Sequence, residues 1–380
     1  MITRRSLIKG GILCACGLCL GKKFDAWAED VYTPESLKGI NQGFPVKEAM
    51  YYEKLEDIRV KCRLCPRECT IADMERGYCG VRENRGGTYY TLVHSRVCAL
   101  NVDPIEKKPL FHYFPGTKAY SLATAGCNVE CKFCQNWQIS QYRPEQIDSI
   151  KLSPEDVINE AQRSGSKTIA FTYSEPVVFY EYMFDIAQLS RKHGLHSVMI
   201  SNGYIQEKPL KELCDHLSAV KIDLKGFSEK FYQETCSGEL KPVLNTLLTL
   251  KNTGIWFEIV VLLIPTLNDN EKEIKAMCAW VRDNLGMDVP VHFTRFHPTY
   301  KIKNLPPTPV KTLETAREIA CDSGLRFPYV GNVPGHEGEN TYCPHCRNIA
   351  IKRAGFSIIE NHLNGNICRD CKQPIPGMWI

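Results

Sequence analysis

Short apolar runs alternate with amphipathic segments from about residue 117 onward. The apolar runs are continuous and rich in β-branched residues, which is typical of strands buried on both faces of a parallel sheet. The amphipathic segments have a helical period, and the first begins with Ser153-Pro154, a capping residue followed by a proline. The predicted strands are 119–125, 167–173, 195–201, 219–224, 255–263 and 289–296, and the stretch 325–330 completes the series. The helices that we predict after Ser153 are 177–193, 208–216, 243–253, 271–284 and 310–323.

This alternation predicts an α/β protein whose core, residues 117–330, is a partial (β/α)6 barrel of the TIM type. In such a barrel the reactive groups lie on loops after the strand ends. An open doubly wound sheet is the alternative, but no Gly-x-Gly-x-x-Gly follows the first strand. We expect two small cysteine-rich appendages, an N-terminal module over 29–116 and a tail over 331–380.

The segment 101–116 combines alternating charges, aromatic residues and residues that break regular structure. We therefore expect an ordered loop that leads into the first core strand. Glu106 and His112 lie in this loop, and we expect them to pack rather than to face a site.

Residues 1–28 are predicted to be a twin-arginine-type signal peptide. Thr3-Arg-Arg-Ser-Leu-Ile-Lys9 is followed by an apolar run and by the small-x-small sequence Ala26-Trp27-Ala28. The apolar run is too short to span a bilayer, so we expect no membrane span in the mature chain. A hydrophobic N-terminal helix that is kept in the cytoplasm is the alternative.

The net charge of the chain depends on those residues. The 47 basic and 43 acidic side chains give +4, but residues 1–28 hold five basic residues and one acidic residue. The remainder carries 42 charges of each sign. Because a neutral body has no net basic field, we expect no nucleic acid as a partner.

Nineteen cysteines are too many for an ordinary core of this size, and they form groups with ligand-like spacing. Cys127, Cys131 and Cys134 lie on one short loop after the first core strand. Three thiolates ligate three irons of a cubane [4Fe-4S] cluster and leave the fourth iron open for a chemical ligand. Radical S-adenosylmethionine (SAM) enzymes use this arrangement, in which the amino and carboxylate groups of SAM chelate the fourth iron. A zinc knuckle or free thiols are the alternative, although three cysteines make a poor tetrahedral zinc site.

Two further cysteine groups have four members each. Cys62, Cys65, Cys69 and Cys79 are separated by turn residues and can surround one metal ion or cluster; zinc, bare thiols and a second cluster all remain open. Cys343, Cys346, Cys368 and Cys371 form two Cys-x-x-Cys knuckles that resemble a zinc ribbon. A structural zinc is the predicted ligand of the tail, and a redox role for the cysteine pairs is the alternative.

Polar residues follow several of the predicted strands. Glu175 follows the second strand, and Asn202 follows the third. Lys221, Asp223 and Lys225 alternate along the fourth, so the two-residue period puts them on one face. Three charges on a buried strand are costly unless they face a polar cavity or one another. We therefore predict a site at this rim.

Arg295 and His297 follow the sixth strand, and we expect them at the same rim. For Lys221, Asp223 and Lys225, the alternative to a site is an edge strand whose charges are solvated.

With these residues in place, the chain resembles the radical SAM component of the AmmeMemoRadiSam system, a family related to pyruvate formate-lyase activating enzymes. The resemblance covers nearly everything from Tyr51 to Trp379. Its most specific segments are Cys-Arg-Leu-Cys-Pro-Arg-Glu-Cys69, Asp-Pro-Ile-Glu-Lys-Lys-Pro-Leu110, Gly-Cys-Asn-Val-Glu-Cys-Lys-Phe-Cys-Gln-Asn-Trp-Gln-Ile-Ser-Gln141, Tyr-Ser-Glu-Pro176 and Asp-Leu-Lys225.

The resemblance implies that Cys127, Cys131 and Cys134 ligate the cluster. It also implies that Glu175 holds the SAM amino group, that Asn202 contacts the ribose, and that Asp223 and Lys225 lie by the SAM carboxylate. The wider superfamily has Gly-Gly-Glu where this chain has Tyr-Ser-Glu, which keeps the acid. Activating enzymes are expected to place a monovalent cation near the SAM carboxylate, and we hypothesise that the Lys221 ammonium substitutes for it.

Two functions follow from these observations. The first is a radical SAM oxidoreductase that takes an electron from an external one-electron reductant, cleaves SAM to a 5′-deoxyadenosyl radical and abstracts hydrogen from a substrate. A residue on a partner protein is one candidate substrate. The second is a zinc-ribbon or iron–sulfur binding or electron-transfer protein without SAM turnover. The signal peptide predicts export, whereas the supply of SAM and of reductant favours the cytoplasm.

Overall fold

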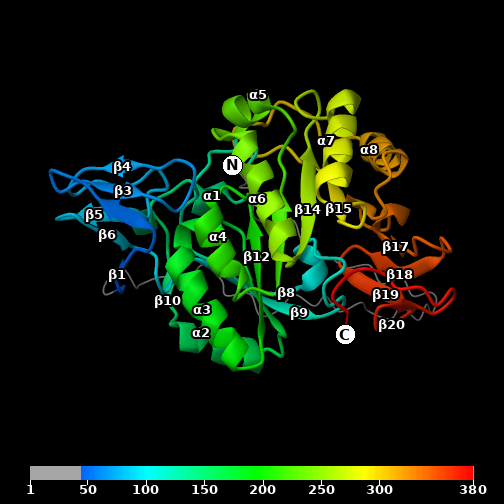
Figure 1. Ribbon diagram of the computed structural model, residues 1–380, viewed down its shortest axis with the longest axis horizontal. Coiled ribbons are helices and arrows are strands. Elements are labelled where there is room, and N and C mark those ends of the chain that lie inside the picture. The colour runs from blue at the N-terminus through cyan, green and yellow to red at the C-terminus, as the bar shows by residue number, and fades with distance from the viewer. Residues whose placement is uncertain (1–43, 380) are drawn as a thin grey trace, which may run out of the picture. The chain divides into compact units, whose positions relative to one another are not determined.

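The computed structural model describes residues 44–379, so the predicted signal peptide lies outside the described residues. Within this range, eight strands form a central sheet in the order β16-β15-β14-β13-β12-β11-β9-β8 (Figure 1). Within this sheet β9 and β11 to β16 are all parallel to one another, and β8 pairs antiparallel with β9 at one edge. The strands are β8 (Ala99–Pro104), β9 (Lys118–Ala123), β11 (Thr168–Phe171), β12 (His196–Ser201), β13 (Ala219–Asp223), β14 (Trp256–Leu263), β15 (Val291–Arg295) and β16 (Pro328–Gly331).

Helices connect successive parallel strands and begin where the sequence supplies a cap. The Ser153 hydroxyl accepts from the Asp156 N–H at the start of α2, and Pro154 takes the first helical position. Glycine ends another helix: the C-cap of α6 is Gly254, which has φ of +74°. The helices are α1 (Trp137–Ser140), α2 (Pro154–Arg163), α3 (Tyr180–Lys192), α4 (Glu207–Cys214), α5 (Glu229–Phe231), α6 (Leu240–Thr253), α7 (Glu271–Asn284) and α8 (Val310–Asp322).

The predicted order of strands and helices in the core is confirmed. The helix predicted at 177–193 is divided into a 3₁₀ turn, η3 (Pro176–Phe179), and α3. One prediction is wrong: the segment 101–116 is not a loop throughout, because β8 covers its start and a 3₁₀ turn, η1 (Ile105–Lys107), follows. The segment is a strand because residues 99–104 pair with β9, and the sequence pattern of the segment alone does not show this pairing. No pairing joins β8 to β16 among the described strands, so the sheet is open.

Small antiparallel sheets make up the chain before β8. One has the order β1-β6-β5 and another β2-β3-β4, while β7 pairs with β10. These strands are short because turns and cysteines interrupt the apolar positions, and their buried side chains join the cluster of the core. Their bounds are β1 (Lys47–Glu48), β2 (Tyr52–Lys54), β3 (Val60–Cys62), β4 (Thr70–Ile71), β5 (Arg82–Arg85), β6 (Thr88–Thr91), β7 (Arg96–Val97) and β10 (Ile150–Lys151).

The tail contains a three-stranded antiparallel sheet in the order β17-β18-β19 and a hairpin of β20 and β21. Its apolar side chains share a cluster with Phe111 and with Phe327 and Tyr329 at β16, so the tail packs on the core. Buried Arg353 strengthens this contact by donating to the Phe111 carbonyl over 2.9 Å. The strands are β17 (Thr341–Tyr342), β18 (Ile349–Ala354), β19 (Ser357–Asn361), β20 (Leu363–Asn364) and β21 (Ile367–Cys368).

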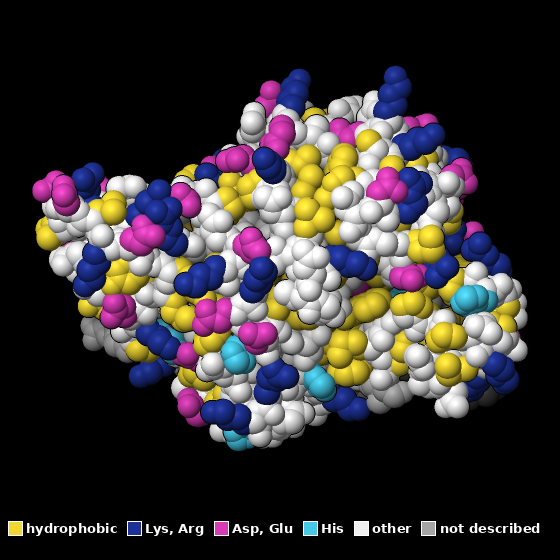
Figure 2. Space-filling view, viewed as in Figure 1, with side chains coloured by type: hydrophobic (Ala, Val, Ile, Leu, Met, Phe, Trp, Pro, Cys, Tyr) yellow, Lys and Arg dark blue, Asp and Glu magenta, His cyan; other side chains and the backbone are white. Residues whose placement is uncertain are grey.

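The surface agrees with the neutral charge balance beyond residue 28. Figure 2 shows acidic and basic side chains interspersed over the face drawn, without a broad field of one sign. Within residues 44–379, no helix has both the length and the apolar composition needed to cross a bilayer.

Candidate functional site

A cavity of about 520 Å³ lies at the carboxyl ends of the parallel strands. Parallel strands end at the same edge of a sheet, so the residues that follow them converge there. The structure brings the residues predicted for this rim together around the cavity. They are Cys127, Cys131, Cys134, Glu175, Asn202, Lys221, Asp223 and Lys225.

The three cysteines lie on the loop between β9 and α1. The Gly126 N–H donates to the Ile139 carbonyl over 2.9 Å, which closes the loop on itself. The N–H groups of Glu130 and Lys132, on either side of Cys131, donate to the carbonyls of Cys236 and Thr235. The loop is thus fixed on both sides before any ligand binds.

Glu175 is buried and organises two strand ends. Its carboxylate accepts from the Ser201 hydroxyl over 2.7 Å, from the Asn202 N–H over 2.8 Å and from the Val177 N–H over 3.1 Å. Burial raises the pKa of Glu175, and these three donors oppose the rise. Ser201 was not predicted as part of the site.

Asn202 joins this network to the cysteine loop. Its side-chain amide donates to Asn128 Oδ1 over 2.8 Å and lies 3.8 Å from Cys127 Sγ. Its own oxygen accepts from the Tyr204 N–H over 2.8 Å. The orientation of the Asn202 side chain is therefore set by three neighbours.

Lys221, Asp223 and Lys225 share one face of β13 and its continuation, as predicted. Lys221 forms an ion pair with Asp223, and Lys225 Nζ lies 3.6 Å from the other Asp223 oxygen. Burial lowers the pKa of Lys221, and Asp223 opposes the change. Burial alone would raise the pKa of Asp223, but the two ammonium charges outweigh it and lower that pKa. The two lysines therefore lie on either side of the Asp223 carboxylate at the cavity wall.

Two cationic side chains of the cavity wall were not predicted. Lys107 and Lys108 line it, and both bind Asp103, with Nζ to oxygen distances of 2.9 and 2.5 Å. Burial lowers the pKa of Lys108 to about 8 against the pull of Asp103. Tyr173 also donates to Asp103 and has φ of +64° directly before Ser174-Glu175. The sequence signals for this group were the charges within 103–108 and the resemblance of the segment that ends at Leu110.

Other predictions near the rim have mixed outcomes. His112 and Glu106 pack as expected: His112 contacts the Tyr329 hydroxyl over 2.6 Å, and Glu106 accepts from the Gly116 N–H. Arg295 and His297 follow the sixth core strand at the carboxyl end of β15, as predicted, but neither lines the cavity. Arg295 Nε donates to the Thr308 carbonyl over 2.8 Å, and His297 is exposed.

The N-terminal cysteines also converge. Cys62, Cys65, Cys69 and Cys79 line one cavity together with Arg82 and Tyr89. Cys62 ends β3, Cys69 precedes β4, and the Cys62 N–H donates to the Cys69 carbonyl over 2.9 Å. The hairpin thus brings the two halves of the motif together.

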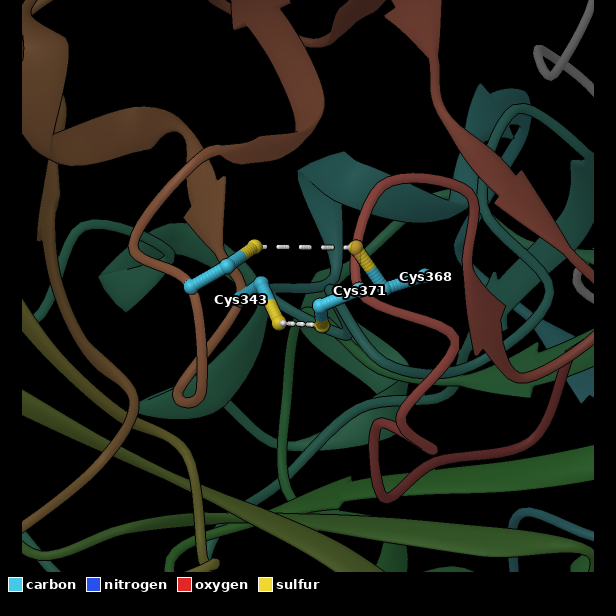
Figure 3. A group of neighbouring side chains, drawn as sticks. Cys343, Cys368 and Cys371 are labelled. Carbon is cyan, nitrogen blue, oxygen red and sulfur yellow. Dashed lines mark hydrogen bonds between the residues drawn. The ribbon is translucent and has the colours of Figure 1, made fainter.

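The tail cysteines come much closer to one another. Cys343 Sγ lies 3.5 Å from Cys371 Sγ, and Cys346 Sγ lies 3.9 Å from Cys368 Sγ (Figure 3). All four sulfur atoms lie within 4.8 Å of one another. Thiolates at about 2.3 Å from one zinc ion are about 3.8 Å apart, so this spacing suits a zinc site with four cysteine ligands.

Comparisons with known proteins add family information. The family model described as the Radical SAM superfamily matches residues 121–280. The chain is 47% identical over 332 residues to the uncharacterized protein MJ0808 of Methanocaldococcus jannaschii. The match covers 87% of this chain and 99% of that protein. It is 21% identical over 168 residues to the pyruvate formate-lyase-activating enzyme of Clostridium pasteurianum, which covers 42% of this chain and 67% of that enzyme. A solved radical SAM methyltransferase from Sphaerobacter thermophilus is 13% identical, with a TM-score of 0.46, over 60% of this chain and 71% of that chain.

Proposed function

Because the chain belongs to the radical SAM superfamily, we propose that its central cavity binds a [4Fe-4S] cluster and SAM side by side. Cys127, Cys131 and Cys134 hold the cluster in this proposal. When bound and reduced, the cluster supplies the electron that cleaves SAM to a 5′-deoxyadenosyl radical. The enzyme then takes hydrogen from a substrate, for which a residue on a partner protein is one candidate.

The residues present fit both groups. Three thiols on a closed loop match a cluster with one open iron, and the cavity of about 520 Å³ extends from them to the strand ends. Glu175 holds a buried negative charge that suits the SAM ammonium, and Asn202 is oriented beside Cys127 to meet the ribose. Lys225 offers a cation to the SAM carboxylate, while Asp223 positions both lysines of its strand.

One observation carries the proposal: the three thiols, the acid, the amide and the Lys-Asp-Lys face all line a single cavity. Chain reconstituted anaerobically with iron and sulfide, then given dithionite and SAM, should yield 5′-deoxyadenosine and methionine. Chain that binds the cluster without forming either product would instead support an iron–sulfur binding or electron-transfer protein.

The finer assignments belong to the same proposal. Motif resemblance supports a radical SAM component of the AmmeMemoRadiSam type. The alternation of apolar and amphipathic segments supports a partial (β/α)6 barrel over 117–330, and the sequence pattern supports the division into a signal, an N-terminal module, a core and a tail. The hydrogen donor is sought by incubating reduced enzyme and SAM with deuterated extract or candidate partners. Deuterium in 5′-deoxyadenosine identifies a donor, and its absence shows uncoupled cleavage.

We expect Glu175→Gln to weaken SAM binding by roughly 10- to 100-fold, the equivalent of losing one charge-assisted hydrogen bond. The amide also loses charge and accepting capacity toward the Ser201 and Asn202 donors. Equilibrium dialysis with labelled SAM measures the change. Glu106→Gln is the matched control, because Glu106 is also buried but does not line the cavity. Equal affinity in Glu175→Gln and wild type would remove Glu175 from the SAM site.

We expect Lys221→Met to make SAM cleavage dependent on potassium. The Lys221 ammonium is buried and paired with Asp223, so it supplies the positive charge that a bound monovalent cation would otherwise provide. The wild-type rate should be the same in potassium and in choline buffers, whereas the variant should be slow in choline and recover in potassium. Potassium-dependent cleavage by the wild type would contradict this role.

A further inference from the structure

The four N-terminal cysteines differ in spacing from the tail cysteines. Among the residues that the structure describes, the tail set forms the one group of His, Cys, Asp or Glu ligand atoms that all lie within 4.8 Å of one another. No three of Cys62, Cys65, Cys69 and Cys79 meet that limit within residues 44–379, although all four line one cavity. One zinc ion needs sulfur atoms about 3.8 Å apart, so the N-terminal set is too widely spaced for it.

The three cysteines of the central loop share this wider spacing, because they too line one cavity without meeting the limit in the described chain. A cubane binds each thiolate through a different iron, so its protein sulfur atoms lie further apart than those on one ion. The spacing of the N-terminal set therefore matches the loop that fits a cluster and not the tail that fits zinc.

The wall of the N-terminal cavity suits thiolates in a negatively charged cluster. Arg82 is fully buried, and its Nη1 lies 3.8 Å from Cys62 Sγ. Its ion pair with Glu181 holds the guanidinium in place, while its Nε has no hydrogen-bond partner in the described structure. A buried donor without an acceptor is costly, so a negatively charged group beside Cys62 would stabilise this wall.

The N-terminal cavity lies next to the central cysteine loop. Arg67, between Cys65 and Cys69, donates to the Asn128 carbonyl over 2.6 Å, and Asn128 lines the N-terminal cavity itself. A Cβ on Gly126, the residue before Cys127, would come within 3.0 Å of the Cys79 carbonyl. These contacts place the two cysteine loops side by side.

An open cleft of about 780 Å³ also joins the two sites. Cys79 lines both this cleft and the N-terminal cavity. Cys127 lines both the cleft and the central cavity. A one-electron carrier held by the four cysteines would thus lie beside the loop where the central cluster is proposed.

We propose that Cys62, Cys65, Cys69 and Cys79 bind a second [4Fe-4S] cluster, one with four protein ligands and no open iron. This inference does not rest on SAM turnover, because it concerns the ligands of a different site. It predicts a cluster that persists when the central loop cannot bind iron and that does not respond to SAM.

The test uses the full chain with Cys127, Cys131 and Cys134 all replaced by alanine. After anaerobic reconstitution it should hold about four irons and about four sulfides, the content of one cluster. Reduced with dithionite, it should give an electron paramagnetic resonance signal that SAM leaves unchanged. Chain with Cys62→Ala and Cys65→Ala should also hold about four irons, but its signal should change when SAM is added.

Metal analysis decides between the cluster and zinc. Triple-alanine chain that contains no iron, or that holds zinc beyond the amount bound by the tail, would overturn the second cluster. The retained central signal in the Cys62→Ala, Cys65→Ala chain shows that this variant is folded. If that chain keeps the full iron content of the wild type, the four cysteines are not the ligands.

Discussion

Replacing Cys131 with alanine is expected to abolish the formation of 5′-deoxyadenosine from SAM and dithionite. Cys131 is the buried middle residue of the three-cysteine loop, and hydrogen bonds from Glu130 and Lys132 fix the backbone on both sides of it. Without its thiolate the loop keeps two ligands, which leaves two irons of a cubane without a protein ligand. Product formation under anaerobic conditions, followed by chromatography, measures the effect.

Cys321→Ala is the matched control for this change. Cys321 is exposed on α8 and lines neither the central nor the N-terminal cavity, so SAM cleavage should be unchanged. Cys346→Ala should mainly lower yield or stability, because it acts on the tail. Normal turnover by Cys131→Ala would show that the reactive cluster is held elsewhere.

The core was predictable because parallel strands are buried on both faces. Their apolar runs are unbroken, and the helices between them carry strong end signals such as Ser153-Pro154. The site followed from the same pattern, since the ends of successive parallel strands meet at one edge. Glu175, Asn202 and Lys221 needed no further information to be placed around one cavity.

The rest depended on contacts that are distant in the sequence. β8 is an edge strand that is mostly partly exposed and includes an asparagine, an aspartate and a proline, and only its pairing with β9 makes it a strand. Lys108 reaches the cavity because Asp103 holds it there, and Asp103 is in turn held by Tyr173, 70 residues further along the chain. Arg295 does not line the cavity for the converse reason, since its side chain donates to the backbone carbonyl of Thr308.

The tail shows how a cysteine site supports a fold that has few apolar residues of its own. Cys343 and Cys368 are buried in the cluster that joins the tail to Phe327 and Tyr329 of the core. Phe356, in the turn between β18 and β19, lines the central cavity. A change at the tail site therefore has a path to the central site.

We expect chain with Cys343→Ser and Cys346→Ser to lose about one zinc per chain and to melt at a clearly lower temperature. Structural zinc contributes about 10 kcal/mol to folding in isolated zinc peptides. In this chain the tail also packs on the core, and that packing offsets part of the loss when zinc is removed. The four sulfur atoms are already at zinc spacing, so ion loss removes the contact that holds both knuckles together. Metal analysis and calorimetry measure the two effects, and Cys321→Ala is again the control. Wild-type chain without zinc, or a double variant with unchanged melting, would show that the tail is held by packing alone.

Displacement of Phe356 should also slow SAM cleavage in the double variant while the iron content stays constant. That result separates an effect of the tail from a loss of cluster ligands.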